Sequence, residues 1–336
     1  MAVRAGIFGL SGPALLPQEA AFFREVAPWG FILFARNISD PEQVSRLTAD
    51  LRASVGRDAP ILIDQEGGRV LRLGPPHWRR WQPVMGRFDG ADEDAALEAA
   101  RLRYRIIADE LRAVGVDVNC APVLDVLAPE GHDVIGNRAL GREPGAVSRR
   151  GQAVAEGLLA GGVLPVIKHI PGHGRATVDS HLHLPRVQTG RTELERVDFA
   201  PFRAMAHHAL AMTGHVVFEA IDPEQCATLS PVVIDLIRNE IGFDGLLMTD
   251  DLSMSALDGS MTSRTEGALA AGCDMILHCN GRMDEMKEVA GSLPALDGAA
   301  ARRAALAEAA RTPPDGLDIG AAAQAYEALT GEVLHV

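Results

Sequence analysis

Short apolar runs alternate with helical patterns along the whole chain, and this alternation predicts an α/β fold. Several runs are nearly continuous in hydrophobic residues, as parallel strands covered on both faces are. Eight strands separated by helices fit a closed (β/α)8 TIM barrel, with some irregular units, better than an open sheet. The chain has 336 residues, a length that such barrels reach as one domain. The eight runs are Gly6–Leu10, Trp29–Ala35, Pro60–Asp64, Val116–Pro122, Leu164–His169, Ala211–Phe218, Gly245–Thr249 and Asp274–His278.

Helix start and stop signals lie between these runs. Asp40–Pro41 predicts a capped helix start, and Ser230–Pro231 repeats the pattern before a helix that Gly242 ends. Ser263 and Glu266 have the spacing of a capping box, which predicts another helix start there.

The last part of the chain, from about residue 281 to 336, is expected to be a helical segment packed on the barrel. It is too short for a second core domain of its own. We therefore expect one catalytic barrel domain over residues 1–336.

Composition excludes several classes of protein. The 32 Lys and Arg residues against 45 Asp and Glu residues give a net charge of −13, which disfavours binding to nucleic acid. No apolar run reaches the roughly 18 residues that a membrane span needs, and we interpret Met1–Leu16 as a strand and loop. Four cysteines without a CxxC pair are typical of a reduced core. They are Cys120, Cys226, Cys273 and Cys279. We expect a cytoplasmic monomer that needs no cofactor and contacts no membrane.

Polar residues follow four of the apolar runs, where the C-terminal ends of barrel strands carry function. Asp64, Glu66, Arg69 and Arg72 come just after the third run. Asp250 comes directly after the seventh run, and a carboxylate at a buried strand end is costly unless it is used or paired. Arg138 lies after the fourth run, and Lys168 lies near the end of the fifth. With Arg72 they are candidates for binding a hydroxylated or acidic ligand.

The densest polar segment is residues 168–185, with Asp179 and four histidines. The histidines are His169, His173, His181 and His183. One interpretation is a metal-dependent hydrolase, because imidazole and carboxylate groups bind zinc or iron. Ile-Pro-Gly between the first two histidines, however, cannot hold the helical spacing of a zincin site. The other interpretation is acid/base chemistry, in which the Asp179 carboxylate fixes the tautomer of His181 and raises its pKa.

Six motifs together resemble glycoside hydrolase family 3. In chain order they are IDQEGGRVLRL, NCAPVLDV, GNRALG, KHIPGHGRATVDSHLHLP, MTGHVVF and MTDDLSM. The similarity runs from about residue 30 to 280 and is strongest to the bacterial single-domain exo-β-N-acetylglucosaminidases of cell-wall recycling. The family's two-domain β-glucosidases lack the histidine-rich loop.

The resemblance implies a retaining double displacement. Asp250 would be the nucleophile, His181 the general acid/base and Asp179 its partner. The implied substrate is N-acetylglucosamine linked β-1,4 to 1,6-anhydro-N-acetylmuramic acid, with or without a stem peptide. By the same resemblance, the residues that would bind the N-acetylglucosamine are Asp64, Arg72, Arg138, Lys168 and His169.

Two departures from the family pattern are Gly214, where alanine is expected, and TDD in place of the commoner SDD. Trp78 and Trp81 are candidates either for stacking on a ligand or for packing against the barrel. A non-catalytic amino-sugar binding protein on the same barrel is a further alternative, but the presence of Asp179, His181 and Asp250 together favours an enzyme.

Overall fold

The computed structural model describes residues 2–87, 92–180 and 182–335, so the proposed general acid/base His181 lies outside the described residues. Eight parallel strands in this part of the chain form one sheet in the order β10-β1-β2-β3-β4-β5-β7-β9. A parallel bridge between Met248 and Met275 joins β9 to β10 and closes the sheet. The predicted (β/α)8 barrel is therefore confirmed. The strands are β1 (Arg4–Phe8), β2 (Pro28–Leu33), β3 (Ile61–Ile63), β4 (Val118–Asn119), β5 (Leu164–Ile170), β7 (Leu210–Thr213), β9 (Leu246–Met248) and β10 (Ile276–His278).

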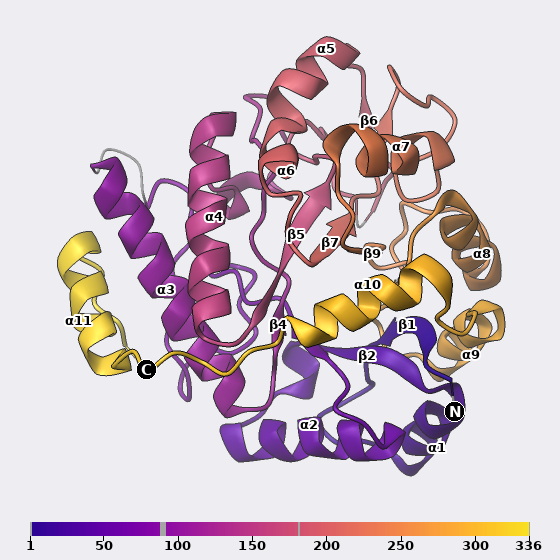
Figure 1. The fold of residues 1–336 in the computed structure, drawn as a ribbon, viewed down its shortest axis with the longest axis horizontal. Coiled ribbons are helices and arrows are strands. Elements are labelled where there is room, and N and C mark those ends of the chain that lie inside the picture. Colours follow the sequence, from indigo (N-terminus) through magenta and orange to yellow (C-terminus); the bar gives the residue numbers. More distant parts are fainter. Residues whose placement is uncertain (1, 88–91, 181, 336) are drawn as a thin grey trace.

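Helices surround the barrel, and Figure 1 shows them arranged around the central strands. The longer ones are α1 (Pro17–Val26), α2 (Pro41–Val55), α3 (Glu93–Ala113), α4 (Pro144–Ala160), α8 (Met261–Ala271), α9 (Met283–Ser292), α10 (Gly298–Ala309) and α11 (Ile319–Thr330). Three short helices are α5 (Arg191–Glu193), α6 (Ala200–Ala204) and α7 (Pro231–Leu236). The first and the third of these continue as single π-helical turns, over Leu194–Asp198 and Ile237–Ile241.

The helix signals of the sequence were right in two cases and wrong in one. Asp40 caps α2 by accepting from the backbone N–H of Gln43, and Ser230 caps α7 in the same way. The capping box predicted at Ser263 is wrong, because Ser260 caps α8 and Ser263 lies inside its first turn. Either serine could cap the start of this helix, and the local sequence does not show which one does.

One predicted strand is two strands. The run Ala211–Phe218 contains β7 of the barrel and β8 (Val217–Phe218), which pairs outside the barrel with β6 (Arg186–Val187). Gly214 bonds back to the carbonyl of Ile170. The chain then turns, because the N–H of Val216 bonds to the Gly214 carbonyl, and it leaves the barrel.

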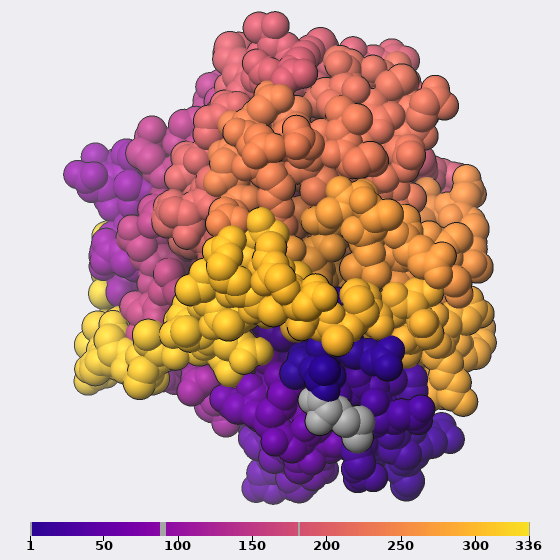
Figure 2. Space-filling view, turned by 45° about the vertical axis from the view of Figure 1, so that its right-hand side comes forward, coloured from indigo at the N-terminus to yellow at the C-terminus, as the bar shows by residue number. Residues whose placement is uncertain are grey.

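The barrel interior and the layer between strands and helices are separate apolar clusters. Interior side chains such as Leu164 and Leu246 share their cluster with Ala304 and Ala307 of α10. This helix crosses the barrel in Figure 1, and the yellow C-terminal segment forms a continuous band over the same face in Figure 2. It closes the end of the barrel where the strands begin.

The segment that follows β10 is largely helical and packs on the barrel at several points. Tyr326 of α11 contacts the ring of Trp81 edge-on and donates to the carboxylate of Glu332 at 2.6 Å. Trp81 is buried, as is Trp78, and its indole N–H donates to Glu110. Packing against the barrel, rather than ligand stacking, is therefore the role of both tryptophans.

All four cysteines are buried and unpaired, as predicted for a reduced core. In the part of the chain that the structure describes, no helix combines the length and hydropathy that crossing a bilayer requires.

Asp117 ties three elements together at the end of the barrel where the strands begin. One carboxylate oxygen accepts from the backbone N–H of Ile61 at 2.8 Å, at the start of β3. The other accepts from Arg52 of α2 and from Arg311 after α10, at 3.1 and 2.8 Å. Asp58 pairs with the same two arginines but is mostly exposed, at 72% of its side chain.

We predict that Asp117→Ala lowers the free energy of unfolding by about 3 kcal/mol, because it leaves buried donors without their acceptor. The matched variant Asp58→Ala removes an exposed partner of the same arginines and should cost less than about 1 kcal/mol. Urea unfolding of the two variants beside the parent measures both. Equal losses would show that the backbone contact with Ile61 contributes nothing.

Candidate active site

Strand periodicity places charged residues inside the barrel at its C-terminal end. Interior positions alternate along a strand, so Leu62 is followed inward by Asp64, Val166 by Lys168 and Met248 by Asp250. These residues belong to or follow β3, β5 and β9, which are alternate strands of the barrel. Inward side chains from alternate strands share a layer. Three charged side chains therefore meet in the top layer.

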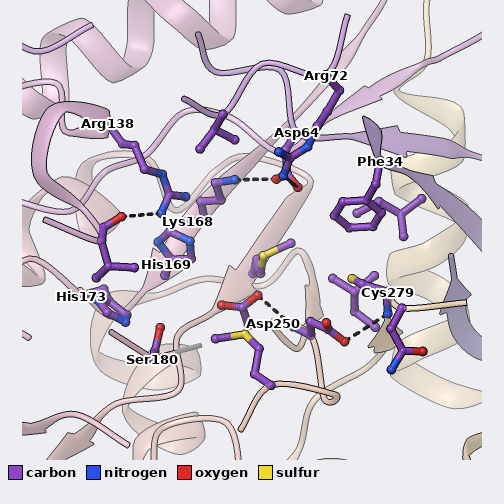
Figure 3. A pocket seen from close by; sticks show the side chains of 18 of the residues that line it. Phe34, Asp64, Arg72, Arg138, Lys168, His169, His173, Ser180, Asp250 and Cys279 are labelled. Carbon is purple, nitrogen blue, oxygen red and sulfur yellow. Dashed lines mark hydrogen bonds and ion pairs between the residues drawn. The ribbon is translucent and has the colours of Figure 1, made fainter. Parts of the chain in front are cut away.

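A cavity of about 290 Å³ opens over this layer. It is lined by all five residues predicted to bind the sugar and by the predicted nucleophile Asp250 (Figure 3). The residues that line it are Ile32, Phe34, Arg36, Asp64, Val70, Arg72, Val134, Ile135, Arg138, Lys168, His169, His173, Ser180, Met212, Asp250, Asp251, Met254, Leu277, Cys279 and Asn280.

A buried network of charges forms one end of the cavity. Lys168, which is 2% exposed, donates to Asp64 at 2.8 Å and contacts Glu66 at 2.6 Å. Arg138 binds both oxygens of Glu66, at 2.8 and 2.9 Å, while Arg72 reaches Asp64 at 3.3 Å. Fixed donors and acceptors of this kind suit the vicinal hydroxyls of a sugar.

The network keeps its members charged. Burial alone raises the pKa of both carboxyls, but the neighbouring cations outweigh it. Lys168 and Arg72 hold the pKa of Asp64 well below its usual range, and Arg138 and Lys168 lower that of Glu66 to about 2. Burial likewise lowers the pKa of Lys168, but the two carboxylates raise it above its ordinary value.

Asp125 fixes the side wall of the cavity. This fully buried carboxylate accepts from the ring Nδ1 of His169 at 2.7 Å, and from the backbone N–H groups of His169 and His173 at 3.3 and 2.7 Å. Burial raises its pKa, but the contacts with the two histidines lower it below the usual value. With Nδ1 bound to Asp125, Nε2 is the nitrogen of His169 that remains available on the cavity side.

Asp250 is held by a ring of hydrogen bonds behind its strand. Its backbone N–H donates to the hydroxyl of Thr213 at 3.4 Å, and this hydroxyl bonds to that of Thr228 at 2.8 Å. Thr228 bonds to Nδ1 of His215 at 2.8 Å, and Nε2 of His215 bonds to the carbonyl of Asp251 at 3.0 Å. The ring connects β7, the loop after it and the end of β9, and so fixes the peptide that carries Asp250.

The neighbouring carboxylate, Asp251, has a structural place. It accepts from the backbone N–H groups of Ser253 and Cys279, at 3.0 and 3.1 Å, and from the Ser253 hydroxyl at 2.6 Å. Asp251 thus shapes the turn after β9, and its backbone N–H donates to the Asp250 side chain at 2.8 Å.

The loop that carries Asp179 begins in close contact with the loop after β4. At Gly174 a Cβ atom would lie 2.0 Å from the carbonyl oxygen of Val126, so only glycine fits. Arg175 of the same loop donates to the buried Asp198 at 2.7 Å. Asp179 is half-buried, and Ser180 beside it lines the cavity. Its predicted partner His181 lies outside the described residues.

Sequence reasoning missed several side chains that organise this site. Glu66 was recognised only as a polar residue after a strand, and Asp125 only as part of a motif. Both are acidic residues close to the ends of apolar runs, and this was the available signal. Arg69, by contrast, turns outward and bonds to the backbone carbonyls of Asp133 and Val134.

The metal-dependent alternative gains no support. Within residues 2–87, 92–180 and 182–335, no three His, Cys, Asp or Glu side chains gather in a way that would hold a metal ion. Asp125 and the two charged residues beside Lys168 are committed to ion pairs and hydrogen bonds instead.

Comparison with known proteins identifies the family. Residues 24–310 match the glycosyl hydrolase family 3 N-terminal domain. This chain belongs to glycosyl hydrolase family 3. A β-hexosaminidase from Nitrosomonas eutropha is 42% identical over 277 residues, which cover 81% of this chain and 79% of that protein. One from Chromobacterium violaceum is 39% identical over 277 residues, 81% of this chain and 77% of the relative.

Solved structures agree with the sequence relatives. NagZ from Neisseria gonorrhoeae, in complex with N-trifluoroacetyl-D-glucosamine, superposes with a TM-score of 0.86 at 32% identity, covering 98% of each chain. This family 3 chain is thus a glycoside hydrolase of the bacterial NagZ type, in the β-hexosaminidase class. The family resemblance inferred from the six motifs is confirmed.

We predict that Glu66→Gln destabilises this family 3 hydrolase in a pH-dependent way. The folded pKa of about 2 lies below the ordinary 4.5, so ionised Glu66 stabilises the fold above pH 4.5 by about 3 kcal/mol. This contribution is lost as the pH falls towards 2, and more than half of it should be gone by pH 3. Urea unfolding of parent and variant between pH 7 and 3 tests this. The control Glu42→Gln, with a side chain that is 90% exposed, should show no such trend. A Glu66→Gln deficit independent of pH would contradict the prediction.

We predict that Thr228→Val lowers kcat of the hydrolase about tenfold and leaves KM within about twofold. The isosteric change deprives Thr213 and His215 of their shared partner, while the network around Lys168 is untouched. Thr228→Ser keeps the hydroxyl and should retain kcat. Steady-state kinetics on an aryl glycoside give the result. An unaltered kcat in folded Thr228→Val would mean that the ring does not position Asp250.

Proposed function

We propose that this chain is a retaining β-N-acetylhexosaminidase that removes terminal, non-reducing β-linked N-acetylglucosamine from peptidoglycan fragments. The proposed substrate is N-acetylglucosamine joined to 1,6-anhydro-N-acetylmuramic acid, with or without a stem peptide. One observation carries the proposal. Asp250 lines a cavity whose other end is a network of paired charges suited to sugar hydroxyls (Figure 3).

The binding half of the proposal rests on charge and geometry. Asp64, as a carboxylate, accepts hydrogen bonds from two adjacent hydroxyls, and Lys168, Arg72 and Arg138 donate to their oxygens. Nε2 of His169 completes the set. Because these groups are already paired with one another, they are held in place before a sugar arrives, which lowers the ordering cost of binding.

The catalytic half assigns the steps of a double displacement. The carboxylate of Asp250 attacks the anomeric carbon as the bond to the leaving oxygen breaks, and His181 donates a proton to that oxygen. In the second step His181 accepts a proton from water, whose oxygen displaces Asp250 from the sugar. Asp179 holds the imidazole in the required tautomer. The ring of hydrogen bonds behind Asp250 supports the role of Asp250 as nucleophile, because it fixes the peptide of this residue relative to the cavity.

Cavity size favours action at a chain end. A volume of about 290 Å³ is at the small end of ligand pockets and suits one sugar unit rather than a polysaccharide. In the related NagZ structure the bound molecule is N-trifluoroacetyl-D-glucosamine, a single amino sugar. Both observations support removal of a terminal N-acetylglucosamine.

We also propose that residues 1–336 act as one catalytic unit, monomeric and cytoplasmic. Contacts of α10 with the barrel interior and of Tyr326 with Trp81 support the single unit. The four buried, unpaired cysteines support a reducing compartment.

We predict that Asp250→Ala lowers kcat on an aryl N-acetyl-β-glucosaminide by at least about 10⁴-fold, because no other group replaces the nucleophile. Added azide should restore turnover and give the α-glycosyl azide, since the small anion enters from the vacated side. Asp258→Ala changes an exposed carboxylate in the same loop and serves as the control. Residual activity within tenfold of the parent, or rescue yielding the β-azide, would refute the assignment.

A further inference from the structure

One buried polar side chain of the cavity has no partner. His173 is 2% exposed and lines the cavity, yet among the described residues neither its Nδ1 nor its Nε2 atom has a hydrogen-bond partner. A buried polar group without a partner destabilises a fold by about 1–3 kcal/mol. Its neighbour His169, by contrast, has its Nδ1 atom bound to Asp125.

The backbone holds this ring against the cavity. The N–H of His173 donates to Asp125 at 2.7 Å, and the rings of His169 and His173 lie 5.7 Å apart. Behind them is Gly214, where a Cβ atom would come within 3.4 Å of the His173 ring and 3.2 Å of the Cβ of His169. The residue that departs from the family pattern thus leaves room for the imidazole in the wall.

The ring is uncharged at neutral pH. Burial, and then the charge of His169, lower the pKa of His173 to about 4, although Asp125 and Asp250 oppose the shift. A neutral imidazole carries one N–H donor and one bare nitrogen acceptor. It therefore matches a neutral polar group of a ligand and adds no charge beside Asp250.

Its place in the cavity narrows the choice of ligand group. In Figure 3 a wall formed by Arg138, His169, His173 and Ser180 runs from the Lys168 end to the level of Asp250, and His173 lies near the Asp250 end. A sugar bound as proposed above has its anomeric carbon over Asp250. The polar groups next to that carbon are the ring oxygen, the substituent at C2 and the leaving oxygen, and the proposed function already assigns the leaving oxygen to His181. The ring oxygen is the same in every pyranoside, so the C2 substituent is the group through which this wall can distinguish one sugar from another.

We infer that His173 hydrogen-bonds the 2-acetamido group of the bound sugar and so determines the preference for N-acetylglucosaminides over glucosides. The inference rests on the proposed function. The acetamido group offers both an N–H donor and a carbonyl acceptor, so one nitrogen of the neutral ring can form a hydrogen bond with whichever of the two faces it. Its methyl group finds apolar side chains in the same cavity, including Met212 and Met254.

The test compares 4-nitrophenyl N-acetyl-β-glucosaminide with 4-nitrophenyl β-glucoside, which differ only at C2. In His173→Leu, kcat/KM for the N-acetylglucosaminide should fall about tenfold, the effect of one neutral hydrogen bond, and that for the glucoside should stay within about twofold. His173→Gln, which keeps a donor and an acceptor, should retain more of the preference. Because the ring has no partner in the empty cavity, His173→Leu should not lower the melting temperature.

His208→Leu is the matched control, since His208 is also buried, has a pKa lowered to about 4 by burial and lies outside the cavity. It should leave the substrate preference unchanged. Equal losses on both glycosides in His173→Leu would overturn the inference, and so would a loss that follows leaving-group acidity instead of the C2 substituent. If the parent protein neither hydrolyses the N-acetylglucosaminide nor binds N-acetylglucosamine, the proposed function fails instead.

Discussion

The buried ammonium group of Lys168 is the constraint on which the site depends. An unpaired charge at this depth would cost several kcal/mol, so Lys168 requires the carboxylates of Asp64 and Glu66, and Glu66 in turn requires Arg138. These residues come from three separate segments of the chain. In the barrel β3 and β5 flank β4, and their inward side chains share one interior layer. The charge network therefore fixes the ends of these strands, and the fold determines where the network can form.

Two kinds of polar group surround the cavity. They differ in how much of their hydrogen-bonding capacity is taken up by partners within the protein. Asp125, Asp251 and the ring through Thr228 and His215 are fully engaged with backbone and side-chain partners, and such networks rigidify what they hold. They hold the backbone next to Asp250 and the ring of His169 in place. Among the residues that the structure describes, the ring of His173 has no hydrogen-bond partner. An unsatisfied group persists at a site of function because the ligand supplies the partner, whereas elsewhere in the core it would only reduce stability.

The sequence was sufficient for the architecture and for the residues of the top layer. Near-continuous apolar runs identify parallel strands, and the alternation within them places Asp64, Lys168 and Asp250 inward. The sequence did not predict the features that depend on which residues, distant in the chain, come into contact. The split of Ala211–Phe218 into β7 and β8 depends on hydrogen bonds to Ile170 and Pro185. The contact of Asp125 with His169 joins the loop after β4 to strand β5, 44 residues away in the sequence, and no local pattern distinguishes it from the conspicuous Asp179–His181 pair. Local sequence preference indicates where helices and strands form, whereas contacts between distant residues determine which strands pair and which side chains bind one another.

The two Asp–His pairs of this chain illustrate why their roles should differ. Asp125 is wholly buried, and it binds backbone N–H groups as well as His169, so its imidazole cannot change position without breaking several bonds. A group held so firmly suits binding, where a fixed geometry lowers the ordering cost. Proton transfer requires an imidazole that can adjust its position. The same ring must first give a proton to the departing oxygen and then take one from water. In the proposed mechanism this task belongs to His181 with Asp179, which is half-buried. The proposal therefore gives the same two residue types different roles, one pair as a rigid support for a ligand contact and the other as the proton carrier.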